Sequence, residues 1–448
     1  MLERPEKPKK LKMLLYLNVL RFLHFKPLKL FWHFKLFIFM LTVLLFILIL
    51  GLLVVAHEFG HFITARKSGM KVFEFGFGFP PRALGLYRDP QSKKIVWVFG
   101  NGKKTENTDQ KSTLANTVGG EEREEEYPST LWSINWLPLG GFVKIKGENG
   151  ENSQDNDSFG AQKAWKRIVV LVAGVTMNII LAIVILSFGF MIGLPADLSN
   201  GVDDKAIVVE KASVLVQQVE ENSPAQLAGI KFGDKILRIG LAEETWFENE
   251  RLLGEDINSQ KLITYVSEHS TEELSVVVER GNENLILKMK PEMIENAETP
   301  KLGIALADAG MIKYPWYLAI YKGFVATFIV LANIFIQVYL LLKSLILGQG
   351  LAFEVSGPIG IATIVGQSAK LGFSYLLNVT AMLSLSLAAI NILPIPALDG
   401  GRVVFIILEK IFKKPVPMKY EQIAHTIGFM LLMILIVLVT WRDIAKLF

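Results

Sequence analysis

The fold is decided by residues 36–61, LFIFMLTVLLFILILGLLVVAHEFGH, where a long apolar run leads directly into a His-Glu-x-x-His motif. The run from Leu36 to Val55, with the turn of the motif added, is long enough to cross about 30 Å of hydrocarbon. On a helix, His57 and His61 project from one face, as two ligands of one zinc ion must, and Glu58 lies beside them, placed to take a proton from water. A charged residue inside a membrane helix costs at least ~2.5 kcal/mol and is normally retained for function. The alternative is that the histidines cap the helix at the membrane interface while Glu58 snorkels to water.

Composition places the chain among polytopic membrane proteins with soluble inserts. Of its 448 residues 51% are hydrophobic and 20% are charged, and the mean hydropathy is +0.38. The net charge of +4 is too small and too dispersed to indicate a nucleic-acid partner; most basic residues flank apolar runs, where lipid headgroups would meet them. Since the chain has no cysteine, zinc would have to be held by histidine and carboxylate.

The sequence predicts four spans and one sizeable soluble domain, a division that gives eight segments. They are a basic amphipathic N-terminal segment on the membrane surface (1–35), the first transmembrane helix with the zinc motif (36–64), a cytosolic-side loop with membrane-associated β elements and an acidic insert (65–167), the second transmembrane helix (168–194), a PDZ-like extracytoplasmic domain (195–315), an interfacial amphipathic helix (316–350), the third transmembrane helix with a Leu-Asp-Gly motif (351–402), and a cytosolic-side linker with the fourth transmembrane helix (403–448).

The loop after the zinc motif carries alternating aromatics and glycines, which favour a strand or hairpin over a helix. In Val72–Pro81 these include Phe75, Phe77 and Phe79. An edge strand beside a zinc site could hold an unwound substrate through main-chain hydrogen bonds. An inert hairpin dipping into the membrane is the alternative. The acidic run Glu121–Glu126 reads as a solvated insert, because it lacks the spacing of a calcium loop.

The long polar stretch at 195–315 is predicted to be an α+β domain. Residues 216–239 read as strand, short helix, Gly-Asp turn and strand, and residues 274–289 read as a hairpin. The run through Gly233-Asp234 resembles a PDZ domain, a fold that takes extended peptides as an added strand. Leu302-Gly303-Ile304 is a weak carboxylate-binding loop, so a size filter or packing module stays open beside peptide binding.

The third zinc ligand is predicted near the end of the third span, in NILPIPALDGGR at residues 391–402. Its two prolines unwind the helix, which a membrane tolerates only where the freed backbone is buried or lines a cavity. Asp399 is the carboxylate best placed to complete a site of two histidines and one acid. In the second span, Asn178 requires an interior partner, either another helix or the substrate.

The pairing of Asp399 with His57 restricts the topology, because both must lie on the same side of the membrane. If the first span enters the cytoplasm at the motif, the PDZ-like domain lies outside and the third span re-enters. If the apolar residues 324–347 also crossed the membrane, Asp399 would lie on the wrong side of it. They are therefore predicted to lie on the outer interface.

Taken together, these segments resemble the site-2 protease family of intramembrane zinc metalloproteases, and most of all its bacterial branch, typified by the regulator of sigma-E protease. Besides the PDZ-like domain, the resemblance rests on His57–His61, Phe77–Pro80, Leu137–Val143, Ala173-Gly174 with Asn178, Ser356–Ile359 and Asn391–Arg402.

The resemblance implies Zn²⁺ bound by His57, His61 and Asp399, with Glu58 as general base. It implies substrate contacts from Asn391 and Asn178, together with a strand-donating hairpin near Phe75–Phe79. The expected protein is a multi-pass enzyme of the bacterial cytoplasmic membrane that cuts the membrane segments of single-span proteins, such as anti-sigma factors or remnant signal peptides.

A non-catalytic zinc-binding scaffold that recruits partners through the PDZ-like domain is the competing hypothesis. Glu58 argues against it, since a structural zinc site needs its ligands but no base. A transporter is the third possibility, and it is disfavoured because the sequence has no inverted repeat of broken helices.

Overall fold

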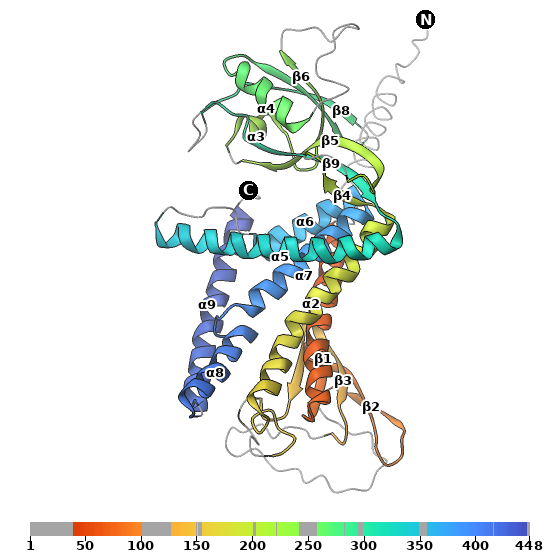
Figure 1. Cartoon of the computed structure of the whole chain (residues 1–448), viewed down its shortest axis with the longest axis vertical. Coiled ribbons are helices and arrows are strands. Elements are labelled where there is room, and N and C mark those ends of the chain that lie inside the picture. Colours follow the sequence, from red (N-terminus) through yellow and green to blue (C-terminus); the bar gives the residue numbers. More distant parts are fainter. Residues whose placement is uncertain are drawn as a thin grey trace, which may run out of the picture.

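The structure is a computed structural model in which a bundle of helices separates two β-sheets (Figure 1). It describes residues 39–100, 127–148, 150, 155–199, 203–220, 222–241, 258–281, 283–293, 299–348, 356–414 and 416–445. The basic segment predicted at 1–35 and the acidic run at 121–126 lie outside the described residues.

Five helices in the described part of the chain are long and apolar enough to cross a membrane. Such helices suit lipid because each satisfies its own backbone hydrogen bonds. Four of them run along the bundle, whereas α5 lies across it at the end that faces the larger sheet (Figure 1). The placement of residues 316–350 on the membrane interface stays a prediction, with which the crosswise course of α5 agrees. The five are Phe39–Lys67, called here the motif helix, α2 (Ala164–Ile192), α5 (Trp316–Ile346), α7 (Phe373–Ile392) and α9 (Met418–Ala445).

The segment 351–402, predicted as one spanning helix, instead contains α6 (Pro358–Leu371), α7 and the start of α8 (Asp399–Phe412). Gly372, with a φ of +121°, separates α6 from α7, and glycine adopts this conformation without the strain that other residues would suffer. The strongly apolar stretch begins only after this glycine, at Leu376, and the polar residues Gln367 and Lys370 before it were a usable signal of the break. The chain is non-helical from Leu393 to Leu398, as the two prolines predict.

The smaller sheet lies beside the motif helix and consists of β1 (Val72–Arg88), β2 (Ile95–Phe99) and β3 (Leu131–Ile145), in the order β2-β1-β3. Residues 74–77 of β1 pair with residues 131–134 of β3 and also with residues 141–144. The first half of β1 is therefore an interior strand, and the prediction that residues 72–81 supply a free edge is wrong. Within the described part of the chain, the strand outside this half of β1 is formed by residues 141–145, because β3 turns back at Gly140, where φ is +91°; these residues are called here the free edge for their position in the sheet.

One face of this sheet is almost wholly apolar. The strand register places Leu84 beside Phe99 and Ile134, and Leu86 beside Trp97 and Trp132. Close to the motif helix, Trp132 packs on Phe62 with ring centroids 5.0 Å apart. Farther out the side chains are 50–71% exposed, and such an apolar surface agrees with the prediction of membrane-associated β elements, which stays a prediction. The exposed side chains are Trp97, Phe99, Ile134 and Trp136.

The larger sheet, with two short helices, forms the PDZ-like domain, and its strand order is β4-β9-β5-β6-β7-β8. Alternate residues such as Val214 and Val276 are fully buried in its core. The Asp308 carboxylate accepts hydrogen bonds from Ser259 N (2.7 Å) and Oγ (2.8 Å), which ties the start of α4 to β9. The predicted α+β domain is confirmed. Its elements are β4 (Leu194–Asp197), β5 (Ile207–Val219), α3 (Pro224–Ala228), β6 (Lys235–Leu241), α4 (Ser259–Glu268), β7 (Leu274–Arg280), β8 (Glu283–Met289) and β9 (Ile304–Lys313).

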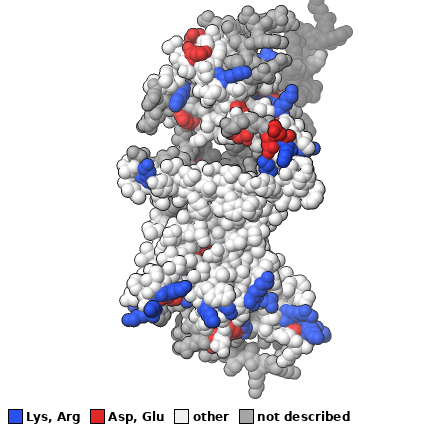
Figure 2. All heavy atoms as spheres, in the orientation of Figure 1, with Lys and Arg blue, Asp and Glu red and all other residues white. Residues whose placement is uncertain are grey.

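The PDZ-like domain rests on the end of the bundle where α5 lies (Figure 1). Lys322 of α5 donates to Asp203 at 2.5 Å. A Cβ added at Gly233, in the Gly-Asp turn, would lie 3.6 Å from the Leu371 side chain of α6. Charged side chains gather at the two ends of the molecule and leave an uncharged band between them (Figure 2), as expected for a protein that spans a bilayer.

Candidate metal centre

The motif helix presents His57 and His61 on the face that packs against α2. Both residues are buried, with 7% and 8% of their surface exposed. Gly60, between them, lets the two helices approach closely, because a Cβ there would lie only 2.3 Å from the carbonyl oxygen of Ala173. The predicted histidine pair therefore lies inside the bundle and not at its interface with water.

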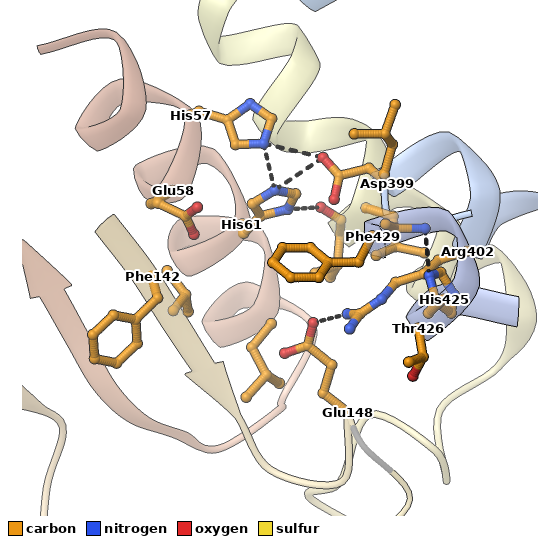
Figure 3. A pocket seen from close by; sticks show the side chains of 16 residues that line it. His57, Glu58, His61, Phe142, Glu148, Asp399, Arg402, His425, Thr426 and Phe429 are labelled. Carbon is orange, nitrogen blue, oxygen red and sulfur yellow. Dashed lines mark hydrogen bonds and ion pairs between the residues drawn. The ribbon is translucent and has the colours of Figure 1, made fainter. Parts of the chain in front are cut away.

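Asp399, the first residue of α8, brings its carboxylate to the two histidines. Its Oδ2 lies 3.0 Å from Nε2 of His57 and 3.4 Å from Nε2 of His61, and the two Nε2 atoms are 3.2 Å apart. The three side chains converge on one point (Figure 3). Within the described residues, no other group of three or more His, Asp or Glu side chains is arranged to hold a metal ion.

Neighbouring groups orient both imidazoles. Nδ1 of His61 donates to the carbonyl of Val170 at 2.8 Å, which leaves the Nε2 lone pair directed at Asp399. Asn178 is fully buried; its Nδ2 lies 3.4 Å from Nδ1 of His57, while its Oδ1 has no partner. Exchanging the amide oxygen and nitrogen, which have nearly the same shape, gives the His57 N–H an acceptor and satisfies Oδ1. Asn178 thus serves as a partner of His57.

The residues fit a zinc ion. Three acceptor atoms at 3.0–3.4 Å repel one another unless a cation lies between them, and tetrahedral zinc with bonds of ~2.1 Å separates its ligand atoms by ~3.4 Å. Oδ2 of Asp399 is buried and has no hydrogen-bond partner. A Cβ at Gly174 would lie 2.4 Å from Nε2 of His61 and 2.8 Å from Nε2 of His57, so this glycine keeps the space beside the ligand atoms open.

Gly174→Ala is expected to weaken zinc binding by ~10–100-fold, the size of effect produced by disturbing residues around a metal site. The added methyl group would push on both imidazoles. Competition with a chelator measures the affinity. Gly189→Ala, on the same helix, is the matched control, because its Cβ would meet only the flexible side chain of Leu194. Equal affinities in the two variants would contradict the assignment.

Glu58 lies between the histidines and the free edge of β3. The backbone N–H of Val143 donates to its carboxylate, and a Cβ at Gly141 would lie 3.6 Å from Cγ of Glu58. The carboxylate lies beside His61 in Figure 3, and it is not part of the group of three ligand atoms that lie within 4.8 Å of one another. This arrangement places a proton acceptor beside the metal site without making it a ligand.

A cavity of about 500 Å³ opens beside the three ligands. Sequence reasoning missed part of its lining. Arg402, which forms an ion pair with Glu148, lies one helical turn after Asp399, and that spacing was a usable signal. No local pattern in the sequence indicated that α9 lines the cavity, because this depends on how a separate helix packs. The missed residues are Glu148, Arg402, His425, Thr426 and Phe429.

None of the five predicted substrate contacts lines this cavity. Phe75 is 7% exposed and packs on Phe62, which leaves it no surface for a substrate. Phe77 lies against Gly51 of the motif helix, and Phe79, 49% exposed, covers Gly140. Asn178 contacts His57, and Asn391 is half-buried in the last turn of α7.

Known proteins resemble this chain over most of its length. The sequence model described as Peptidase family M50 matches residues 45–103 and 123–435. The regulator of sigma-W protease RasP of Bacillus subtilis is 29% identical over 457 residues, covering 92% of this chain and 100% of that protein. The zinc metalloprotease RasP of Oceanobacillus iheyensis is 29% identical over 464 residues, covering 91% and 100%. A Clostridium perfringens relative is 34% identical over 394 residues, covering 88% and 95%.

Among solved structures, the PDZ domain of an SdrC-like protein from Listeria monocytogenes matches 23% of this chain and 95% of its own length, with 24% identity and a TM-score of 0.17. The match to the family, in contrast, includes the segments that carry both histidines and Asp399. The chain therefore belongs to Peptidase family M50 and is a multi-pass bacterial membrane protein with the activity of a zinc metalloprotease.

Proposed function

We propose that this protease cleaves peptide bonds within or near the membrane segment of single-span proteins, with zinc held by His57, His61 and Asp399 and with Glu58 as general base. The observation that carries the proposal is the buried three-ligand site in the spanning part of the bundle, with a carboxylate and a free strand edge beside it. Zinc there supplies Lewis acidity toward water and toward a peptide carbonyl.

The residues around the site transfer the proton and hold the substrate. Glu58 accepts the proton of the attacking water and delivers it to the leaving amine. The substrate helix must unwind first, because its own hydrogen bonds shield its carbonyl groups. The free edge at residues 141–145 offers main-chain partners that offset this cost by strand addition. Asn391 and Asn178 remain part of the proposal, Asn178 through its contact with His57.

If the substrate binds by strand addition, every second substrate residue near the cut should donate a backbone hydrogen bond to the protease. In a synthetic membrane-spanning substrate, single N-methyl groups on alternate residues near the cut should stop cleavage, because each removes a donor facing residues 141–145. Methyl groups on the intervening residues should leave most of the activity. Cleavage of each peptide by the purified protein is followed by mass spectrometry. A loss of cleavage that varies smoothly with the distance of the methyl group from the cut would contradict strand addition.

The PDZ-like domain is proposed to lie outside the cytoplasmic membrane. At the opposite end of the bundle lie the end of the motif helix, the start of α2 and the end of α8 (Figure 1), and basic residues next to these ends fit the enrichment of lysine and arginine in cytoplasmic loops. Resting on α5 and α6 through Asp203 and Gly233, the domain is placed to exclude substrates with bulky outer parts or to bind a peptide end. The residues at the basic end are Arg66, Lys67, Lys166, Arg167, Lys413 and Lys414.

Anti-sigma factors and remnant signal peptides are the proposed substrate types. The resemblance in sequence supports this, and one relative is named as the regulator of sigma-W protease. The test uses purified full-length protein with a panel of single-span substrates whose outer parts are progressively truncated. Cuts mapped inside the membrane segment, and favoured by truncation, are expected. A zinc-loaded protein that captures partners through its PDZ-like domain but cuts none of them would favour the scaffold hypothesis.

A further inference from the structure

The backbone turn that leads to Asp399 is not fully stabilised by its own hydrogen bonds. Ala397 has a φ of +80°, in the left-handed region where a residue other than glycine is strained. The backbone hydrogen bonds of the turn join Ile395 to Leu393, Leu398 to Ile395 and Gly401 to Leu398, and they do not use the N–H of Ala397. A strained conformation of this kind persists only when its surroundings enforce it.

A histidine of α9 supplies the missing partner. The N–H of Ala397 donates to Nδ1 of His425 at 2.8 Å, so the proton of this ring resides on Nε2. The ring also packs on Phe405 of α8, with ring centroids 5.6 Å apart. Its Nε2 is buried without a hydrogen-bond partner, and Oε1 of Glu421, one turn earlier, is 3.9 Å away. The position of His425 is therefore set by its packing and by the Ala397 peptide.

A second contact brings the same turn of α9 against the loop. A Cβ at Gly428 would lie 2.3 Å from the carbonyl oxygen of Pro396, so only glycine permits this approach. Gly428 is the one buried residue among the described residues of α9. At the far end of the helix, Asp443 accepts from the N–H of Gly360 at 2.8 Å. The turn before Asp399 is thus one of the places where this helix closely contacts the rest of the protein.

We propose that His425 is a positioning residue, which holds the Ala397 peptide and thereby fixes the Asp399 carboxylate against His57 and His61. The inference rests on the proposed role of Asp399 as the third zinc ligand. Since Ala397 lies two residues before Asp399, loss of the hydrogen bond lets the turn relax from its positive φ and moves the carboxylate away from the histidines. In this arrangement α9, and not α8 alone, determines the geometry of the zinc site.

The test measures zinc affinity and kinetics on the full-length protein in detergent. His425→Phe keeps the ring but removes the acceptor. We expect zinc affinity, determined by chelator competition, to fall by ~10–100-fold, as for other groups that support metal ligands. At saturating zinc, kcat should fall while KM for a single-span substrate changes little. His425→Asn can place Oδ1 close to the position of Nδ1, and it should recover most of both losses.

Two further variants separate positioning from simple damage to the fold. Gly428→Ala, which leaves His425 intact but forces α9 away from Pro396, should also weaken zinc binding. Thr440→Val is the control on the same helix, because its hydroxyl bonds only to Ile436 within α9, at 2.6 Å. It should retain the affinity and kcat of the parent protein.

Parent-like zinc affinity in His425→Phe would overturn the inference, as would equal losses in His425→Phe and His425→Asn. The variant Asp399→Asn shows whether the positioning role of His425 fails or the assignment of Asp399 as a zinc ligand fails. If it loses zinc while His425→Phe does not, only the positioning role fails. If Asp399→Asn itself binds zinc like the parent protein, the ligand assignment in the proposed function fails.

Discussion

Glu58→Gln should lower kcat for a single-span substrate by ~10²–10⁴-fold, the usual contribution of a general base. Glutamine keeps the size of the side chain and can still accept the hydrogen bond from Val143. It cannot take a proton from water at neutral pH. Because Glu58 does not belong to the group of three side chains arranged to hold the metal, zinc affinity should stay within a small factor of the parent value.

The measurement is the single-turnover rate of cleavage, with zinc content determined on the same samples. Glu279→Gln is a suitable control, since it also removes one carboxylate but lies in the PDZ-like domain, 3.7 Å from Lys235 on an exposed surface. A Glu58→Gln enzyme that cleaves at the parent rate would show that the base has been assigned to the wrong residue.

Asp399→Asn should bind zinc far more weakly than the parent protein, by more than the ~10–100-fold expected for groups that only support ligands. The amide is a poor zinc ligand and carries no charge to balance the cation. Activity should fall in parallel, and a chelator should abolish the activity of the parent protein. Zinc added back after removal of the chelator should restore activity in the parent protein and not in Asp399→Asn.

Zinc content after dialysis against graded chelator concentrations gives the affinity directly. Asp308→Asn serves as a control that loses a buried carboxylate elsewhere, where it caps α4 through Ser259. Retention of zinc by Asp399→Asn at every chelator concentration would contradict the three-ligand site.

The meeting of the three side chains could be predicted because each signal is short. His57 and His61 follow from a helical spacing of four residues, and Asp399 follows from a carboxylate placed after two helix-breaking prolines. Glu58 comes with the histidine motif. The PDZ-like domain could also be recognised, since its strands and its Gly-Asp turn are marked by local patterns.

The errors concern features that depend on pairing between distant segments. The alternating aromatics of residues 72–81 indicate a strand but not its neighbours, and only the register shows that both halves of β3 enclose it. The same register buries Phe75, which the sequence pattern offered to a substrate. The role of His425 depends on α9 meeting the Asp399 turn, and no local pattern specifies that contact.

The apolar face of the smaller sheet has a consequence for the depth of the zinc site. A lone membrane helix adapts to a thicker or thinner bilayer by tilting. Here the motif helix is joined to the sheet through Phe62, Phe75 and Trp132, so a tilt would lift Trp97 and Phe99 out of lipid or drive the polar face of the sheet into it. Hydrophobic mismatch must then be relieved by the lipid around the protein, which holds the histidines at a constant depth in the bilayer.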